Sequence, residues 1–378
     1  MNPQFPFTID PAHCHLAREF KHTSPLIGCR FDPLGRVLFV SAQDSTLQRF
    51  DLFTGKTTAF VGHKSWVRGM AFVPEPRDAT RPPASFPALD ALAGGPGTLM
   101  PPPPAVTPFT LITGDYHGNL LWWPGAAENP TPTQTVEAHA GWVRAVAVSP
   151  DGQTLASCGN DSLVKLWSVA EGKPIRTLEG HTSHVYNVVF HPDGNRLVSA
   201  DQKGIIKDWN WRTGAVVREF EAKALYKYDN AFKADIGGVR GIAFNGDGSL
   251  LACAGITNVS NAFAGVGNPA VVLVDWKSWQ PKQELKPAAA FQGTAWGVAF
   301  HPAGYIVGAG GGNGGAIWFW KADAAASFHA VTVPQSARDM ALSPDGTLIA
   351  VALPSGTAQV YSLAPDSRPK SAEPPKKK

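Results

Sequence analysis

Cysteine is scarce in this sequence. Its 378 residues include only four, Cys14, Cys29, Cys158 and Cys253, and their spacing does not match that of zinc-binding motifs. Three of the four fall in segments predicted to be strands, where a free cysteine packs as a small apolar side chain. We therefore expect free thiols, no metal site and a reducing compartment, which we take to be the cytoplasm.

Long hydrophobic runs are also missing. No apolar stretch reaches the roughly 18 residues of a membrane-spanning helix, and the N-terminal residues lack the apolar segment of a secretion signal. No long amphipathic run is present either, whereas glycine (38 residues) and proline (33 residues) are abundant. The sequence therefore predicts neither membrane spanning nor secretion, and it favours an all-β fold with many turns.

The chain has little excess charge. Its formal net charge is +3, and residues 365–378 alone also sum to +3. The rest of the chain is therefore close to neutral. A dedicated nucleic-acid-binding domain normally carries a basic face and not only a basic tail, so the sequence disfavours nucleic acid as a partner.

Residues 139–181 show how the chain is organised. This stretch contains four short apolar runs, at 143–148, 154–158, 163–167 and 174–178, separated by turn residues. The segment 149–152, Ser-Pro-Asp-Gly, predicts a tight hairpin, since proline presets φ and glycine tolerates positive φ. The four runs predict one antiparallel sheet that is apolar on both faces. Such a sheet has to be covered on each side, so we expect copies of it to pack against one another.

Copies of this unit recur along the chain. The hairpin reappears as DPLG, HPDG, NGDG, HPAG and SPDG, and its glycines from Gly152 through Gly194, Gly248 and Gly304 to Gly346 are 42, 54, 56 and 42 residues apart. A histidine before the first strand and a tryptophan at the end of the third complete the pattern. Units with this length and these markers resemble the WD40-repeat family, and the resemblance covers residues 16–364.

The resemblance implies a β-propeller, a ring of four-stranded antiparallel blades. Residues 15–22 look like an outer fourth strand without its three predecessors, while the last unit, 337–363, has three strands and no fourth. We therefore predict that the N-terminal strand completes the last blade and closes the ring, which removes two free sheet edges. Seven segments resemble a first strand and predict seven blades: 26–31, 67–73, 143–148, 185–190, 239–244, 295–300 and 337–342.

The predicted domain organisation has three parts. Residues 1–15 are interpreted as an N-terminal arm, 16–364 as a single propeller, and 365–378 as a disordered tail rich in proline and lysine. Three insertions interrupt the repeats. They are a proline-rich loop at 74–108 in blade 2, residues 221–236 between blades 4 and 5, and residues 256–269 between strands two and three of blade 5. By the family layout the last two emerge on one rim, called the top, and the first on the opposite rim.

Four polar or aromatic residues of the central repeat could form either a catalytic site or a structural hydrogen-bond network. His139, Ser157 and Asp161 could act as base, nucleophile and orienting carboxylate. In the WD40-repeat family these positions, together with Trp167, form a buried hydrogen-bonded tetrad inside one blade. A hydrolase would need such a set once, in an open pocket. We therefore interpret the tetrad as structural.

Other blades repeat the tetrad incompletely. Blade 1 echoes it with His22 and Asp44. By alignment, the aspartate position is occupied by His117 in blade 2 and by Lys203 in blade 4. Blades 5 to 7 lack the histidine, and the sequence predicts that they are less rigid.

The first strands of the blades align on two positions rich in arginine and aromatic residues. The family layout places these positions at the top end of the innermost strands, near the mouth of the channel. Such side chains are typical of binding hot spots, and arginine suits carboxylate or phosphate groups. Alternatively, the arginines pair with Asp115, Asp201 or Asp235 and only join the blades. The expected partner-binding residues are Trp66, Arg68, Trp142, Arg144, His184, Tyr186, Arg240, Trp296 and Arg338.

The sequence therefore predicts a non-enzymatic scaffold that presents its top rim to a protein or an acidic peptide, acting as a monomer and without a cofactor. The fold alone does not establish this, since propellers also include enzymes. The alternative is an enzyme that clamps an anionic substrate with Arg68, Arg144 and Arg240 and uses Tyr186 as nucleophile or acid. It is disfavoured because no pair of carboxylates is apparent at channel-facing positions for acid–base work.

Overall fold

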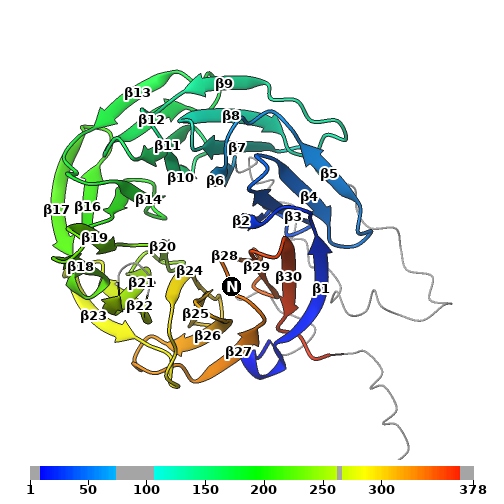
Figure 1. The fold of residues 1–378 in the computed structure, drawn as a ribbon. Helices are drawn as coiled ribbons and strands as arrows, with labels where there is room; N and C mark the ends of the chain where they lie inside the picture. Colours follow the sequence, from blue (N-terminus) through cyan, green and yellow to red (C-terminus); the bar gives the residue numbers. More distant parts are fainter. Residues whose placement is uncertain (1–8, 74–105, 262–265, 367–378) are drawn as a thin grey trace, which may run out of the picture.

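The protein is a ring of seven blades around a central channel (Figure 1). The computed structural model describes residues 9–73, 106–261 and 266–366. Each blade is a four-stranded antiparallel sheet, with its first strand beside the channel and its fourth on the outside. The predicted all-β, seven-bladed propeller is confirmed.

The strands of the first four blades follow one another in chain order. Blade 1 comprises β2 (Leu26–Phe31), β3 (Val37–Ala42), β4 (Leu47–Asp51) and β5 (Thr57–Phe60). Blade 2 comprises β6 (Val67–Phe72), β7 (Thr110–Asp115), β8 (Asn119–Pro124) and β9 (Gln134–Glu137). Blade 3 comprises β10 (Val143–Val148), β11 (Thr154–Gly159), β12 (Val164–Ser168) and β13 (Pro174–Leu178). Blade 4 comprises β14 (Val185–Phe190), β15 (Leu197–Asp201), β16 (Ile205–Asn210) and β17 (Ala215–Glu221).

The last three blades complete the ring. Blade 5 comprises β20 (Gly241–Phe244), β21 (Leu250–Asn261), β22 (Val266–Asp275) and β23 (Gln280–Leu285). Blade 6 comprises β24 (Thr294–Phe300), β25 (Tyr305–Gly311), β26 (Gly315–Lys321) and β27 (His329–Val333). Blade 7 comprises β28 (Asp339–Leu342), β29 (Leu348–Ala352), β30 (Thr357–Ser362) and the N-terminal β1 (His15–Lys21), which follows the short 3-10 helix η1 (Pro11–His13).

The N-terminal strand closes the ring, as predicted. Strand β1 pairs antiparallel with β30, from His15 opposite Ser362 to Lys21 opposite Thr357. Just after β1, His22 Nε2 lies 2.6 Å from Asp44 Oδ2 of blade 1. The first and last parts of the described chain are therefore joined both by a strand ladder and by a side-chain contact.

The hairpin between the first two strands of blade 3 shows why the repeat folds as it does. Gly152 has a φ of 74°, a conformation that glycine adopts without strain. Its N–H donates to the carbonyl of Ser149 at 2.8 Å, and the N–H of Thr154 donates to Ser149 Oγ at 2.9 Å. The turn residues therefore fix the register of β10 and β11, in which Val148 faces Leu155.

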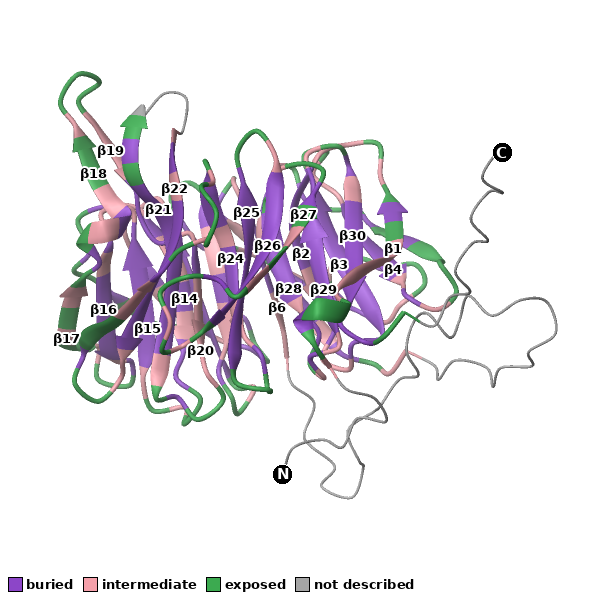
Figure 2. Ribbon diagram, turned by 90° about the horizontal axis from the view of Figure 1, so that it is seen from below, coloured by how far each residue is buried: buried purple, intermediate pink, exposed green. Residues whose placement is uncertain are grey.

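The hydrophobic core lies between the blades. The described buried side chains form seven clusters, one at each interface between neighbouring blades. Figure 2 shows the same arrangement, with buried strands through the body of the ring and exposed residues at its rims. The two apolar faces of each sheet are thus covered by its two neighbours, as the repeat pattern predicted.

The structure describes one of the three insertions in full, residues 221–236, and most of another, residues 256–269 without 262–265. Residues 221–236 connect blades 4 and 5 and form the 3-10 helix η3 (Lys223–Leu225) and a hairpin of β18 (Tyr226–Asp229) and β19 (Ala234–Gly237). In the third insertion, residues 256–261 and 266–269 extend the β21–β22 ladder outward, with Ile256 opposite Pro269. Residues 74–105 of the predicted proline-rich loop, the first eight residues of the predicted arm and residues 367–378 of the predicted tail lie outside the described residues.

Both extensions rise from one rim, the top, as the layout predicted (Figure 2). Lys227 Nζ of the β18–β19 hairpin donates to the carbonyl of Val259 on β21 at 2.6 Å. The hydroxyl of Tyr226 donates to Asp235 Oδ1 at 2.6 Å and holds the two strands of the hairpin together. The top rim above blade 5 is therefore higher than the rest of the ring.

Histidines join neighbouring blades at the opposite rim. His301, in the turn between β24 and β25, places its Nε2 2.7 Å from the carbonyl of Gly346 in the corresponding turn of blade 7. Its Nδ1 accepts the N–H of Ala303 at 3.0 Å, and its ring stacks on Tyr305 with centroids 4.2 Å apart. Burial lowers the pKa of His301 from its ordinary value, although the Gly346 carbonyl opposes this shift.

Because the pKa of His301 is lowered in the folded protein, we expect the protein to lose stability in mild acid. The unfolded imidazole binds a proton near pH 6.5, whereas the folded one does so only at lower pH, so the unfolded state binds more protons between these values. We expect the melting temperature to fall as the pH falls below about 6.5. In the variant His301→Gln, which keeps an amide donor and does not titrate, the fall should be smaller. Thermal unfolding of both proteins across this pH range tests the prediction, and parallel curves would contradict it.

Candidate functional site

The aligned residues of the first strands share one structural position, a β-bulge beside the channel mouth. In five blades the register of the first strand shifts by one residue at this point, for example between Val143 and Ala145. A bulge leaves its extra residue out of the ladder and re-aims its side chain. The extra residues are Ile27, Arg68, Arg144, Tyr186 and Trp296.

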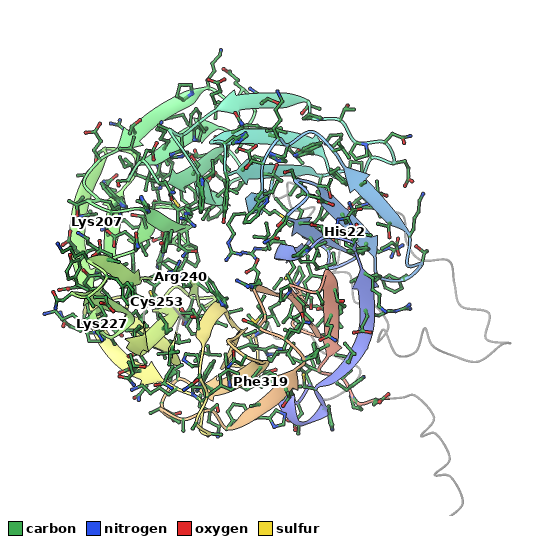
Figure 3. All side chains as sticks on the ribbon, viewed as in Figure 1. His22, Lys207, Lys227, Arg240, Cys253 and Phe319 are labelled. Carbon is green, nitrogen blue, oxygen red and sulfur yellow. The ribbon has the colours of Figure 1, made fainter. Side chains whose placement is uncertain are left out.

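The remaining two blades place an arginine at the equivalent point. Arg240 and Arg338 directly precede β20 and β28, and their N–H groups donate to the carbonyls of Ala254 and Ala352 at 2.7 and 2.8 Å. The structure therefore brings the aligned residues of all seven blades to one circle around the channel. Figure 3 shows Arg240 at the inner edge of the ring, beside the central opening.

These side chains line a hollow, which we call the mouth. It has a volume of about 210 Å³, and its polar and aromatic lining includes Trp66, Arg68, Tyr116, Arg144, Tyr186, Arg240, Trp296 and Arg338. A second hollow of about 360 Å³ shares several of these residues and continues along the inner strands past Arg30 and Asp339. Of the predicted site residues, only Trp142 and His184 do not line the mouth.

Stacked rings occupy one side of the mouth. Trp66 and Trp142 are 40% and 39% exposed, and Tyr116 lies between them. The rings of Tyr116 and Trp142 are parallel, with centroids 4.0 Å apart and an interplanar angle of 3°, and the ring of Trp66 is 5.9 Å from that of Tyr116. The guanidinium of Arg144 continues the stack 4.4 Å from the Trp142 centroid.

The stack extends across blades 4 to 6 through alternating cations and rings. The ring of Tyr186 lies between two guanidinium groups. That of Arg144 is 4.8 Å from its centroid, and that of Arg240 is 4.5 Å from its centroid. Arg240 is also 5.4 Å from the centroid of Trp296. Each such contact stabilises a cation by roughly 0.5–2 kcal/mol, depending on its exposure. The faces of these guanidinium groups are thus held by aromatic rings and not by carboxylates.

The alternative in which these arginines pair with nearby aspartates is not what the described residues show. Asp115 Oδ2 lies 2.9 Å from His63 Nδ1, and Asp201 Oδ2 lies 2.9 Å from His181 Nδ1. Asp235 accepts the hydroxyl of Tyr226. All three carboxylates are therefore bound to residues other than the mouth arginines.

The arginines differ in how they are held. Arg68 Nη1 donates to the carbonyl of Ile27 at 2.6 Å and to that of Arg338 at 3.2 Å, so it links blade 2 to blades 1 and 7. Arg144 Nε donates to Asn160 Oδ1 at 2.7 Å. The Nε of Arg240 is buried and has no hydrogen-bond partner among the described residues. Arg68 therefore has a structural role, while Arg240 has an unused buried donor.

Burial and mutual repulsion act on the charges of the mouth. Burial lowers the pKa of Arg240 from its ordinary value; the interaction with Tyr186 opposes this shift, and the positive charges of Arg144 and Arg68 add to it. Burial also lowers the pKa of His184, with a contribution from the charge of Arg144. His184 therefore stays neutral to lower pH than a free imidazole. Several positive charges are therefore concentrated at the mouth.

The predicted tetrad of blade 3 is formed. His139 Nε2 lies 2.7 Å from Ser157 Oγ, which also accepts the indole N–H of Trp167 at 2.8 Å, and His139 Nδ1 lies 2.9 Å from Asp161 Oδ1. Burial alone would raise the pKa of Asp161, but its hydrogen bond to His139 holds the pKa below its ordinary value. Ser157 is fully buried, so its hydroxyl cannot reach a substrate, and the arrangement is structural.

The aspartate positions predicted for blades 2 and 4 are wrong. The carboxylate partners of the histidines are Asp115 and Asp201, not residues 117 and 203. Both aspartates end a second strand, two residues after the hydroxyl of Thr113 or Ser199, whereas Asp161 follows its serine by four residues. Blades 2 and 4 therefore have complete tetrads, because a carboxylate can reach the histidine from the strand end as well as from the turn.

Tyr116 is a mouth residue that the sequence reasoning missed. It belongs to the turn between β7 and β8, whereas the alignment considered first strands only. Its position directly after the tetrad residue Asp115 is a signal that could have identified it, since this turn ends at the top rim.

The described residues offer no other chemical centre. They contain no group of three or more histidine, cysteine or acidic side chains placed to hold a metal ion. Their helices include none that is long and apolar enough to cross a membrane.

Seven blades, three of which contain a complete buried His–Asp–Ser/Thr–Trp network, define a repeat-built β-propeller. The chain contains repeats of the WD40 type, and its seven-bladed ring agrees with them. Residues 130–168 and 172–208 match the family's "WD domain, G-beta repeat" model. Each match spans the outer strand of one blade and the inner three strands of the next, so the sequence repeat is offset from the blade by one strand.

Named relatives match parts of the chain. Nuclear distribution protein PAC1 of Coccidioides posadasii is 29% identical over 141 residues, which are 37% of this chain and 27% of the relative. Polyadenylation factor subunit 2 of Candida albicans is 35% identical over 63 residues, 17% of this chain and 11% of the relative. Small ribosomal subunit protein RACK1z of Oryza sativa is 58% identical over 38 residues, 10% of this chain and 11% of the relative. The matches thus span about a quarter or less of each relative's length.

Proposed function

We propose that this chain is a non-enzymatic scaffold that binds a protein or an acidic peptide at its mouth. The observation that carries the proposal is that Arg144 and Arg240 converge on one hollow, where aromatic rings stack on their guanidinium faces and none of the described carboxylates pairs with them. Arginine and exposed tryptophan are the residues most enriched in binding hot spots. The names of two relatives, a ribosomal subunit protein and a subunit of a polyadenylation factor, describe components of larger assemblies and support this class of function.

The lining of the channel favours binding over catalysis. Asp339 is the acidic residue among the described side chains that line the two hollows. Its Oδ2 is 2.6 Å from Arg30 Nη1 and also accepts the N–H of Cys29 at 3.1 Å. A bound carboxylate of this kind is poorly suited to take a proton, and the lining offers no second one for acid–base work.

The setting that we propose is reducing and cytoplasmic, with the chain acting as a monomer. All four cysteines are free thiols, and Cys29, Cys158 and Cys253 are buried. Burial raises the pKa of each of these three thiols above its ordinary value. They are therefore apolar packing groups of their blades and not reactive thiolates.

Charge reversal of Arg144 tests the proposed function. In Arg144→Glu, binding of a synthetic peptide pool rich in aspartate and glutamate should weaken by about 2 kcal/mol or more, because a buried attraction becomes a repulsion. Binding to the unaltered protein should also weaken as salt increases. Fluorescence anisotropy at two salt concentrations measures both effects.

Arg212→Glu is the matched control for this experiment. Arg212 is exposed and donates to the carbonyl of Gly194 in a turn of the opposite rim, so the same charge change occurs far from the mouth. Its affinity should match that of the unaltered protein. Equal affinity of the Arg144 variant at low salt, with both variants folded, would exclude the mouth as the binding surface.

A further inference from the structure

The positive charge of the mouth is not neutralised by the described chain. No acidic residue is among the described residues that line the mouth. The carboxylate just below it, Asp339, is bound to Arg30, which lies outside the mouth. Four arginines therefore bring their charges to one small hollow: Arg68, Arg144, Arg240 and Arg338.

Arg240 contributes a buried donor to this hollow. Its guanidinium faces the rings of Tyr186 and Trp296, and its buried Nε has no hydrogen-bond partner among the described residues. A buried donor without an acceptor is costly, and native structures usually satisfy such groups. An acceptor atom of a bound ligand would satisfy the Nε donor of Arg240 and so explain why it is buried without a protein partner.

The stacking leaves the donor edges of the guanidinium groups for a ligand. Arg144 makes one hydrogen bond with the described residues, from Nε to Asn160, and its two terminal nitrogens have no protein acceptor there. Arg68 uses Nη1 for two backbone carbonyls. Several N–H groups from three blades are thus available around a space that suits one compact anion and not a folded surface.

The number of donors and charges distinguishes between anions. A carboxylate brings one charge and two acceptor oxygens. A phosphate monoester brings about 1.5 to 2 negative charges at neutral pH and three acceptor oxygens, and it matches a cluster of arginines by charge-assisted hydrogen bonds. The four arginines of the mouth, one of which has a buried N–H donor without an acceptor, fit the phosphate monoester better than the carboxylate.

We propose that the mouth binds a single phosphate monoester, and that Arg240 Nε donates a hydrogen bond to one of its oxygens. The ester is carried by a peptide side chain or by a small molecule, and the recognising chemistry is the same in both cases. This proposal rests on the proposed function, since it specifies the acidic group that enters the mouth.

Three peptide pools test the proposal. They are random at every position except the centre, which is fixed as phosphothreonine, glutamate or threonine. With the unaltered protein, the phosphothreonine pool should bind at least about tenfold more tightly than the glutamate pool. Free O-phosphothreonine is then added as a competitor. Displacement at similar concentrations identifies a small phosphate ester as sufficient, and weak displacement shows that flanking peptide residues contribute.

Arg240→Met is the decisive variant, because methionine keeps an unbranched apolar chain against Tyr186 and Trp296 while it removes the charge and the buried donor. The variant should lose at least about tenfold in affinity for the phosphothreonine pool, whereas Arg212→Met at the opposite rim should stay within about twofold. The melting temperature of Arg240→Met should be equal to or above that of the unaltered protein, which separates lost binding from lost folding.

The outcomes distinguish this proposal from the proposed function. Equal binding of the phosphothreonine and glutamate pools would overturn the phosphate assignment and leave an acidic-peptide scaffold. Unchanged phosphothreonine binding by Arg240→Met would overturn the assignment of Arg240. Failure of every pool to bind, together with failure of the acidic pool used for Arg144, would overturn both.

Discussion

Deletion of residues 1–22 is expected to lower the free energy of unfolding by at least about 5 kcal/mol and to cause aggregation, because β1 is the fourth strand of blade 7. The ring of Phe20 stacks on Phe50 of blade 1 at 4.8 Å and is buried in the cluster between blades 7 and 1. Ile9, Cys14 and Leu16 pack against the cluster between blades 6 and 7. Fully burying one large apolar side chain contributes about 1.5–3 kcal/mol, so these contacts together reach the expected loss.

Chemical denaturation and size-exclusion chromatography measure this loss. A synthetic peptide of residues 9–22 added in trans should restore part of the stability, and a scrambled peptide of the same composition should not. The variant Phe20→Ala should cost about 3–5 kcal/mol on its own, through the cavity that it leaves. A truncated protein that stays monomeric with an unchanged denaturation midpoint would show that the ring does not depend on β1.

Replacement of Asp201 by alanine is expected to cost about 3–5 kcal/mol, the range for removing one partner of a buried ion pair or hydrogen-bonded charge. The side chain of Asp201 is 1% exposed. Besides its contact with His181, the carboxylate accepts hydrogen bonds from the N–H groups of Lys203 and Ile205 at 2.8 and 3.0 Å. Its loss would leave a buried imidazole nitrogen and two backbone donors without an acceptor. Denaturant unfolding of the variant measures the loss.

Two further variants serve as controls for Asp201. Lys203→Ala should change stability by at most about 0.5 kcal/mol, since its Nζ lies 3.9 Å from Asp235 at a partly exposed site. Asp44→Ala removes the equivalent carboxylate of blade 1, whose side chain is 35% exposed, and should cost about 1 kcal/mol or less. If Lys203→Ala proved as damaging as Asp201→Ala, the tetrad of blade 4 would need a different description.

Much of the fold follows from the sequence because turn chemistry repeats at regular intervals. The hairpin glycines mark six of the blades. The strand-like residues 15–22 lack partners of their own in the sequence, so ring closure could be predicted from them. The position of Arg68, Arg144 and Arg240 could also be predicted, since it lies at a constant offset from each first strand.

The remaining features depend on distances that the sequence does not contain. Asp115 and Asp161 reach their histidines from different places in the repeat, and alignment by turn position therefore selects the wrong residue in blade 2. The extension of β21 beyond Gly255 has turn-like residues in its sequence but continues the ladder. The stacking of Arg144 between Trp142 and Tyr186 depends on how blade 4 is oriented relative to blade 3. A local sequence pattern does not contain that orientation.

The bulge has a consequence for how such a ring can acquire new specificity. A residue that stands outside the strand ladder can change without disturbing the backbone pairing of its blade. Apart from Arg68, whose hydrogen bonds join three blades, the circle of bulge residues therefore behaves as a set of interchangeable side chains on a constant frame. A library randomised at positions 27, 144, 186 and 296 should consist largely of folded rings, each presenting a different chemical surface at the same opening.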